Sequence, residues 1–211
     1  MKANSDTNHG QLYLVAAPSG AGKTSLVHAA LESDPQLVVC ISHTTRERRR
    51  SETDGVNYHF VTQQTFTQMI AEEQFLEYAE VFGQHYGTSK KQVDTLLAEG
   101  KDVILEIDWQ GAEQVRRLVP DVIGIFILPP SVEVLAERLA SRGQDSQKSM
   151  EVRLGQAELE MSKAPNFDYI LVNDDFDETL ADLLCVFRAL RLRKDRQIAG
   201  NPAIQHILSD S

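Results

Sequence analysis

Short apolar runs alternate with segments of helical period along most of the chain. The apolar runs are Leu12 to Ala17, Val38 to Ser42, Asp102 to Asp108, Val122 to Leu128 and Tyr169 to Val172. They are rich in β-branched residues with little polar alternation, which is typical of strands buried on both faces of a parallel sheet. The alternation predicts an α/β fold in which helices flank this sheet on both faces.

Four segments between or beside these runs place apolar residues at spacings of three and four, as on one face of a helix. They are Ser25 to Glu32; Trp109, Ala112, Val115 and Leu118; Val134, Leu135 and Leu139; and Phe176, Leu180, Leu183, Leu184, Phe187 and Leu190. Together with the strands they predict a core that comprises residues 11–41, 89–131 and 156–198.

Two stretches depart from the alternation. Residues 42–88 are polar and aromatic, with short alternating pieces around a small helix near Phe66, which predicts a small β-rich insertion. Ser89 to Gln92 has capping-box spacing and predicts the start of a helix that leads back to the core. Residues 132–155 end in a charged stretch that lacks a hydrophobic face and contains Gly143, which predicts a mobile helical lid. Residues 1–10 and 199–211 are predicted to be terminal tails, the first of them disordered.

Composition narrows the class of protein. At 211 residues the chain is long enough for one domain with inserted parts. A net charge of −10 argues against general nucleic-acid binding, so a phosphate site has to be a local basic island. The longest apolar run has seven residues, against the roughly 20 that cross a bilayer. Cys40 and Cys185 are interpreted as reduced interior residues of a cytoplasmic protein, and the polar N-terminus predicts no signal peptide.

A glycine-rich loop follows the first strand and opens the first helix, the context that a phosphate-binding P-loop requires. Its residues are Ala17, Pro18, Ser19, Gly20, Ala21, Gly22, Lys23, Thr24 and Ser25. Backbone N–H groups of such a loop surround phosphates, the lysine reaches the β- and γ-phosphates, and the threonine hydroxyl binds Mg²⁺. One residue departs from the pattern, because Ala17 stands where its first glycine is expected. The loop by itself predicts only that a nucleotide phosphate binds there.

Asp108 ends the third buried run, where a carboxylate can hold Mg²⁺ directly or through water. The alternative is that Asp108 caps the helix that begins at Trp109, and the two roles are compatible. Thr24 and Asp108 are therefore the candidate metal ligands.

A basic island, Arg46 with Arg48, Arg49 and Arg50, follows the second strand. Its neighbours in the insertion add hydroxyl groups and one carboxylate: Ser42, Tyr58, Glu77, Tyr86 and Thr88. Arginine and phenol groups can hold a monophosphate. A carboxylate such as that of Glu77 can accept from two adjacent N–H groups, which guanine presents and adenine does not.

The chain resembles the guanylate kinase family from about Gln11 to Arg196. The matching stretches are Ala17-Pro-Ser-Gly-Ala-Gly-Lys-Thr24; Ser42-His-Thr-Thr-Arg46 with Arg49, Glu52, Gly55 and Tyr58; Phe75-Leu-Glu77; Phe82-Gly83; Tyr86-Gly-Thr88; Asp108-Trp-Gln-Gly111; Phe126-Ile-Leu-Pro-Pro130; Arg138 with Arg142-Gly143; Arg153; and Val172-Asn-Asp-Asp175. The resemblance implies that Arg46, Arg49, Tyr58 and Tyr86 bind the GMP phosphate, and that Ser42, Glu77, Thr88 and Asp108 contact guanine. The arginine loop departs from the family pattern, with Arg48 in place of proline and Ser51 in place of glycine.

Three arginines lie in or next to the charged stretch: Arg138, Arg142 and Arg153. Phosphoryl transfer needs positive charge on the migrating group and the exclusion of water, and arginines on a closing flap supply both. With Lys23 they are the candidate catalytic residues. The alternative for each arginine alone is a surface ion pair with a nearby glutamate.

These observations predict a cytoplasmic enzyme that uses MgATP to phosphorylate GMP, and dGMP as well, giving ADP and GDP or dGDP. Its partners would be these small molecules and possible further copies of the chain, with no nucleic acid or membrane. Two alternatives are a P-loop kinase with another acceptor, such as a ribose bisphosphate, and a non-catalytic guanylate kinase-like module that binds phosphopeptides. Glu77 with Ser42 and Thr88 favours guanine over the first, and Lys23 with Thr24 and the arginines favours catalysis over the second.

Overall fold

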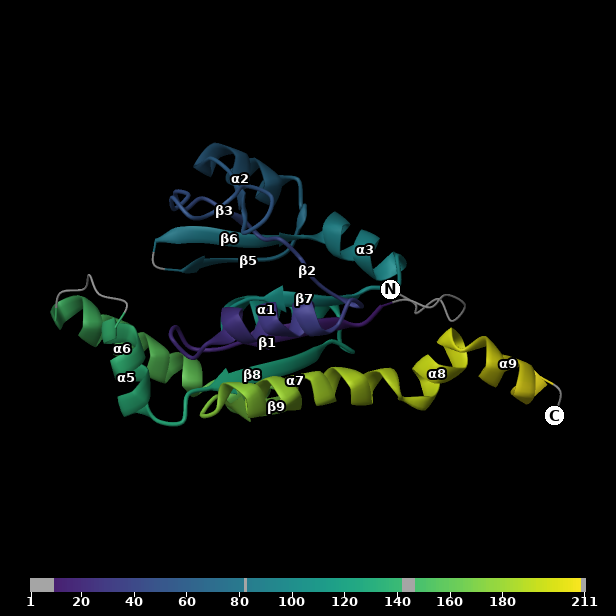
Figure 1. Cartoon of the computed structure of the whole chain (residues 1–211). Helices are drawn as coiled ribbons and strands as arrows, with labels where there is room; N and C mark the ends of the chain where they lie inside the picture. Colours follow the sequence, from purple (N-terminus) through teal and green to yellow (C-terminus); the bar gives the residue numbers. More distant parts are fainter. Residues whose placement is uncertain (1–9, 82, 142–146, 210–211) are drawn as a thin grey trace.

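A parallel five-stranded sheet lies at the centre of the computed structural model, which describes residues 10–81, 83–141 and 147–209 (Figure 1). In order across the sheet, its strands are β2 (Leu37–Val39), β7 (Asp102–Glu106), β1 (Leu12–Ala16), β8 (Ile123–Leu128) and β9 (Tyr169–Val172). Every pairing is parallel. The predicted α/β architecture is confirmed.

Helices cover both faces of this sheet because alternate strand residues point to opposite sides. Tyr13 and Val15 of β1 join a buried cluster with α1 (Lys23–Ser33) and α7 (Phe176–Arg191). Leu12 and Leu14 join another with α3 (Lys90–Ala98) and α4 (Trp109–Leu118). The first strand is thus fixed from both sides, and with it the loop that follows.

A second, four-stranded sheet stands beside the first (Figure 1). Its strands, in order, are β4 (His59–Phe60), β3 (His43–Thr44), β6 (Gln84–Ser89) and β5 (Phe75–Val81), with α2 (Gln63–Ala71) packed against it. The rings of Phe66 and Phe75 lie 4.6 Å apart between helix and sheet. Ser89 caps α3, as its spacing predicted, by accepting from the Gln92 N–H.

Two helices, α5 (Val132–Ser141) and α6 (Gln147–Met161), stand beyond the carboxyl ends of the parallel strands (Figure 1). Leu135, Leu139 and Ala157 form their common core. A short turn, η1 (Ala164–Asn166), then leads into β9. Arg142 and Gly143 of the predicted lid lie outside the described residues, as does the predicted N-terminal tail apart from Gly10.

The C-terminal part continues α7 with α8 (Lys194–Gly200) and α9 (Pro202–Ser209), which extend away from the sheet (Figure 1). The segment predicted to be a tail therefore contains a helix. Arg191 and Arg196 tie this part to the core through the buried Asp102 of β7, which accepts from both guanidinium groups and from the Gln11 N–H. In the described ranges, no helix is both long and apolar enough to cross a membrane.

Three expectations about burial are wrong. Cys185 is exposed: Leu183 and Phe187 face inward, and Cys185, midway between them on α7, lies on the opposite face of the helix. Only one face of β9 is covered: Val172 is 52% exposed at this edge of the sheet. Leu118, expected on the buried face of its helix, is 58% exposed at the end of α4.

Candidate active site

The loop between β1 and α1 has the backbone that its glycines predict. Gly20 and Gly22 both have φ near +94°, a left-handed conformation that other residues adopt at a cost. A Cβ on Gly22 would also lie 2.3 Å from Nδ2 of Asn173. Ala17, at the first position of the loop, packs against the core, and its φ is not positive. Alanine is therefore accepted there without backbone strain.

Asn173 directly follows β9, the edge strand of the parallel sheet, and its side chain holds the P-loop. Its Nδ2 donates to the carbonyl of Ala21 over 2.7 Å, and the side chain is buried. Arg138 of α5 in turn donates to the Asn173 carbonyl at 3.1 Å. The sequence predicted neither contact: Asn173 was given no role, and Arg138 was considered as a candidate catalytic residue.

The end of α6 reaches the same loop. Glu160 accepts from the Ser19 N–H, with 3.3 Å between N and Oε2, and burial raises the pKa of this carboxyl. Three residues on, the Lys163 ammonium lies 4.6 Å from the ring centre of Trp109. The sequence reasoning missed Glu160; its one local signal was an acidic residue five positions beyond the charged stretch.

Lys23 and Thr24 begin α1 beside the carboxyl end of β7. The Lys23 Nζ donates to the carbonyl of Ile107 at 3.4 Å, and the Thr24 hydroxyl donates to Glu106 Oε2 at 3.0 Å. Glu106 was not predicted, although it is the last residue of a buried strand and precedes Asp108 by two positions. Its carboxylate gives Thr24 an acidic neighbour at the predicted metal position.

Asp108 caps α4, so the alternative reading of this residue is confirmed. Its Oδ1 accepts from the Gly111 N–H at 2.9 Å and its Oδ2 from the Gln110 Nε2 at 3.0 Å. The cap holds the carboxylate at the rim of a pocket between the two sheets.

This pocket, of about 160 Å³, brings together residues of the P-loop, of β7 and of the insertion. Its lining comprises Lys23, Ser42, Tyr58, Glu77, Ala79, Val81, Tyr86, Glu106, Ile107 and Asp108. Six of the predicted site residues therefore share one cavity, although they span 86 positions from Lys23 to Asp108.

Glu77 is the most deeply buried acid of the pocket, at 4% exposure. Burial raises its pKa to about 7; the Thr88 hydroxyl, which donates to Glu77 Oε1 at 2.5 Å, opposes this shift, and the charge of Asp108 adds to it. Thr88 faces Glu77 directly across the β5–β6 pair. The strand pairing thus delivers the hydroxyl to the carboxylate.

Glu52 organises the arginine loop, whose Arg46 lies against the ring of Tyr58 in the pocket lining. Its carboxylate accepts from the Arg46 guanidinium at 2.7 Å and from the Arg49 N–H at 2.8 Å. Arg48 donates to the Glu52 carbonyl at 2.8 Å. The residue that replaces proline therefore closes the loop by a hydrogen bond.

The two predicted phenols lie next to this loop. The rings of Tyr58 and Tyr86 meet edge to face at 5.8 Å, and Arg46 lies 5.5 Å from the Tyr58 ring centre. Burial raises the pKa of Tyr58, so its phenol stays a hydrogen-bond donor. Arg49 is exposed. Arg153, on α6, is half-buried.

Known proteins are similar to this chain in sequence and in structure over most of its length. The protein-family model described as guanylate kinase matches residues 9–190. A guanylate kinase from Alkalilimnicola ehrlichii is 54% identical over 95% of this chain and 98% of its own length, and one from Hahella chejuensis is 57% identical over 87% and 88%. The crystal structure of guanylate kinase from Anaplasma phagocytophilum superposes with a TM-score of 0.77 at 29% identity, and covers 98% of this chain and 97% of that one.

Proposed function

The chain belongs to the guanylate kinase family, and we propose how its residues divide the work of the reaction. The enzyme transfers the γ-phosphoryl group of ATP to GMP and gives ADP and GDP. We extend this to dGMP as a second acceptor, because the residues assigned below contact the base and the phosphate, which GMP and dGMP share. We also assign the enzyme to the cytoplasm.

Glu77 reads the base of the acceptor. Its carboxylate lies at the inner end of the pocket, where it can accept from N1–H and N2–H of guanine, while Thr88 and Ser42 supply hydroxyl groups nearby. Asp108 faces the same space and is the second carboxylate available to the base.

Arg46, Arg49, Tyr58 and Tyr86 bind the acceptor phosphate. The phenols line the pocket and Arg46 lies 5.5 Å from the ring centre of Tyr58, so a phosphate placed beside them can meet guanidinium and phenol donors together. Arg46 is held in place by Glu52 before any nucleotide arrives. Preorganised donors of this kind lose less entropy on binding.

The P-loop, residues 17–25, holds the phosphates of ATP through its N–H groups and the start of α1. Lys23 stabilises charge on the transferring group. Arg153 and Arg142, with Arg138, supply further positive charge as the lid helices close, and they exclude water from the reaction. No general base is required, because the chemistry depends on position and charge.

Mg²⁺ fits the oxygen groups beside the P-loop. The Thr24 hydroxyl and the Glu106 carboxylate are 3.0 Å apart, and Asp108 stands two residues beyond on the same strand end. Hydroxyl and carboxylate oxygens, completed by phosphate oxygens, are the ligands that Mg²⁺ prefers. When bound, the ion would neutralise charge between the β- and γ-phosphates. We therefore extend the predicted ligands, Thr24 and Asp108, by Glu106.

The observation that carries the proposal is the shared pocket: the P-loop lysine and the guanine-reading carboxylate line one cavity. A coupled ADP-release assay with GMP, dGMP, IMP, AMP, CMP, UMP and ribose 1,5-bisphosphate tests it. We expect GMP and dGMP to be phosphorylated and IMP, which lacks N2, to be a poor substrate. Equal use of AMP or IMP would contradict the assignment of Glu77.

Lys23→Ala tests whether the ATP-phosphate part of the site acts independently of the GMP-binding part. We expect turnover to fall by about 100-fold or more, because a charge-stabilising group is removed from the transition state. GMP binding, measured by calorimetry, should stay close to that of the unaltered enzyme. Near-normal turnover in this variant would contradict the role of the P-loop, and lost GMP binding would contradict the division of the pocket.

A further inference from the structure

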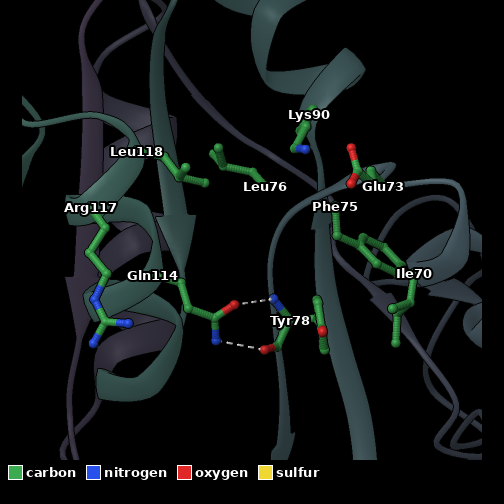
Figure 2. A pocket seen from close by; sticks show the side chains of 9 residues that line it. All are labelled: Ile70, Glu73, Phe75, Leu76, Tyr78, Lys90, Gln114, Arg117 and Leu118. Atoms are coloured by element: carbon green, nitrogen blue, oxygen red, sulfur yellow. Dashed lines mark hydrogen bonds between the residues drawn. The ribbon is translucent and has the colours of Figure 1, made fainter.

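The strand that carries Glu77 is held by a side chain of the core. β5 lies at the edge of the second sheet and pairs with β6 along one side. On its other side Gln114 of α4 faces the backbone of Tyr78: its Nε2 donates to the Tyr78 carbonyl at 2.8 Å, and its Oε1 accepts from the Tyr78 N–H at 3.2 Å (Figure 2). The amide thus pairs with the strand as a neighbouring strand would.

The same face of α4 meets the Glu77 carboxylate one turn earlier. A Cβ on Gly111 would lie 2.6 Å from Glu77 Oε2, so the bare backbone of this glycine makes room for the carboxylate. Gly111 and Gln114 are three positions apart and therefore lie on one side of the helix. The helix contacts two consecutive residues of β5: the side chain of Glu77 and the backbone of Tyr78.

Apolar packing of β5 against α4 is incomplete beside this contact, although Leu76 of β5 packs against the buried cluster that includes Ala112 and Val115 of α4. A pocket of about 490 Å³ opens there, between α4, the start of β5 and the start of α3, and Figure 2 shows the Gln114 pair on its wall. Its lining includes Leu76, Lys90, Arg117 and Leu118. With a space of this size next to the contact, directional hydrogen bonds have more influence on where the strand lies.

The strand is also irregular just before Glu77. The register of the β5–β6 pair shifts between Phe75 and Glu77. Such bulges redirect side chains and interrupt the regular pairing. The segment that precedes the carboxylate is therefore less constrained by its own sheet, whereas the residue that follows it is bound by Gln114.

We propose that Gln114 is a positioning residue for guanine selection: through its paired hydrogen bonds to Tyr78 it sets the place of the Glu77 carboxylate. This inference rests on the proposed role of Glu77. A carboxylate that must meet N1–H and N2–H together requires accurate placement, because hydrogen bonds weaken steeply when misaligned. Loss of the Gln114 pair should therefore affect GMP more than IMP, which lacks the N2 amine.

The test is the ratio of kcat/KM for GMP to kcat/KM for IMP, at saturating ATP. This ratio does not depend on the fraction of enzyme that is folded, so a merely structural effect leaves it unchanged. Gln114→Ala should lower it about tenfold, mostly through a higher KM for GMP, with kcat and the KM for ATP within about twofold of the unaltered enzyme. Arg117→Ala is the matched control: it lines the same pocket from the same helix and contacts Glu113, its own helix neighbour, at 3.9 Å.

Gln114→Glu serves as a second variant in case the alanine variant does not fold. It keeps the size and the acceptor oxygen but replaces the donor to the Tyr78 carbonyl, so it should also lower the ratio. Glu77→Gln is measured in parallel. If Glu77→Gln lowers the ratio and both Gln114 variants leave it unchanged, the inference about Gln114 is overturned while the role of Glu77 stands. If Glu77→Gln itself leaves the ratio unchanged, the proposed role of Glu77 fails, and the inference with it.

Discussion

Glu77 is a residue whose environment opposes the charge that its role requires. Burial and the neighbouring Asp108 raise its pKa to about 7, whereas guanine needs the ionised form to accept two hydrogen bonds. Because the carboxyl is protonated below this value, GMP binding has to displace a proton as the pH falls. The residue therefore couples acceptor binding to pH in the physiological range.

We expect the KM for GMP to rise as the pH is lowered from about 8 to about 6, with little change in the KM for ATP, because Glu77 is then neutral before GMP binds. Glu77→Gln should bind GMP more weakly at the upper end, by about 1.5–3 kcal/mol, the range for hydrogen bonds to a charged group. Steady-state kinetics across this range measure both effects.

The control is the slope of the Glu77→Gln variant. The phosphate of GMP also titrates near pH 6, as phosphate monoesters do, and that contribution remains in the variant. The difference between the two profiles therefore isolates the carboxyl. Parallel profiles would show that Glu77 does not titrate in this range or does not contact the base.

Residue types and local spacing predicted much of this site, and distance along the chain explains what they did not. The P-loop is one contiguous segment, so its residue pattern is recognisable in the sequence alone. Thr24 and Glu106 are separated by 82 positions, Ser19 and Glu160 by 141, and Ala21 and Asn173 by 152. Periodicity identifies the strands and helices but not which of their ends meet, so these contacts appear only in the folded chain.

At the scale of elements, the arginine loop departs from its family pattern and is closed in another way. Arg48 donates to the Glu52 carbonyl, where a proline would restrict the backbone directly. A hydrogen bond on an exposed side chain is weaker than a covalent restriction. The loop should therefore depend measurably on this one contact.

Arg48→Ala is expected to raise the KM for GMP about two- to fivefold, since exposed charged contacts contribute up to about 1 kcal/mol. The KM for ATP should not change. Arg50→Ala is the control, because it removes the same charge two positions further along the loop. Equal effects of both variants would mean that the net charge of the arginine loop, rather than its closure by Arg48, determines GMP affinity.

The lid helices α5 and α6 place Arg153 among the candidate catalytic residues. Arg153→Ala should lower kcat by about 100-fold, the loss typical of a group that stabilises charge in the transition state. Calorimetry should find each nucleotide bound nearly as before, because the lid acts when both are present. Arg188→Ala, an exposed arginine on α7, is the matched control. A nearly unchanged kcat for Arg153→Ala would identify this arginine as a surface residue.

At the scale of the whole molecule, Asp102 joins parts that are far apart in sequence. Its carboxylate, 2% exposed, accepts from Gln11 before β1 and from Arg191 and Arg196 near the C-terminus. Removing one partner of a buried ionic cluster leaves the others uncompensated. The cluster therefore links the beginning and the end of the core.

Asp102→Ala is expected to lower the free energy of unfolding by about 3–5 kcal/mol, because Arg196 and Arg191 lose this buried acceptor, of which Arg191 keeps a second one in Asp34. Urea unfolding followed by circular dichroism measures it. Asp195→Ala, which breaks the exposed Arg193 pair at 3.5 Å, should change stability by less than about 1 kcal/mol. Similar losses in the two variants would contradict a special role for the buried cluster.

The position of β1 in the sheet has a consequence for the nascent chain. β1 and the P-loop are synthesised before both strands that pair with β1: β7 ends at residue 106 and β8 at residue 128. The second sheet draws only on residues 43–89 and can close earlier. At about 5–20 residues per second, β7 and β8 are synthesised several seconds or more after β1, which cannot pair with them before then. The P-loop thus leaves the ribosome well before the strands that hold β1 in place.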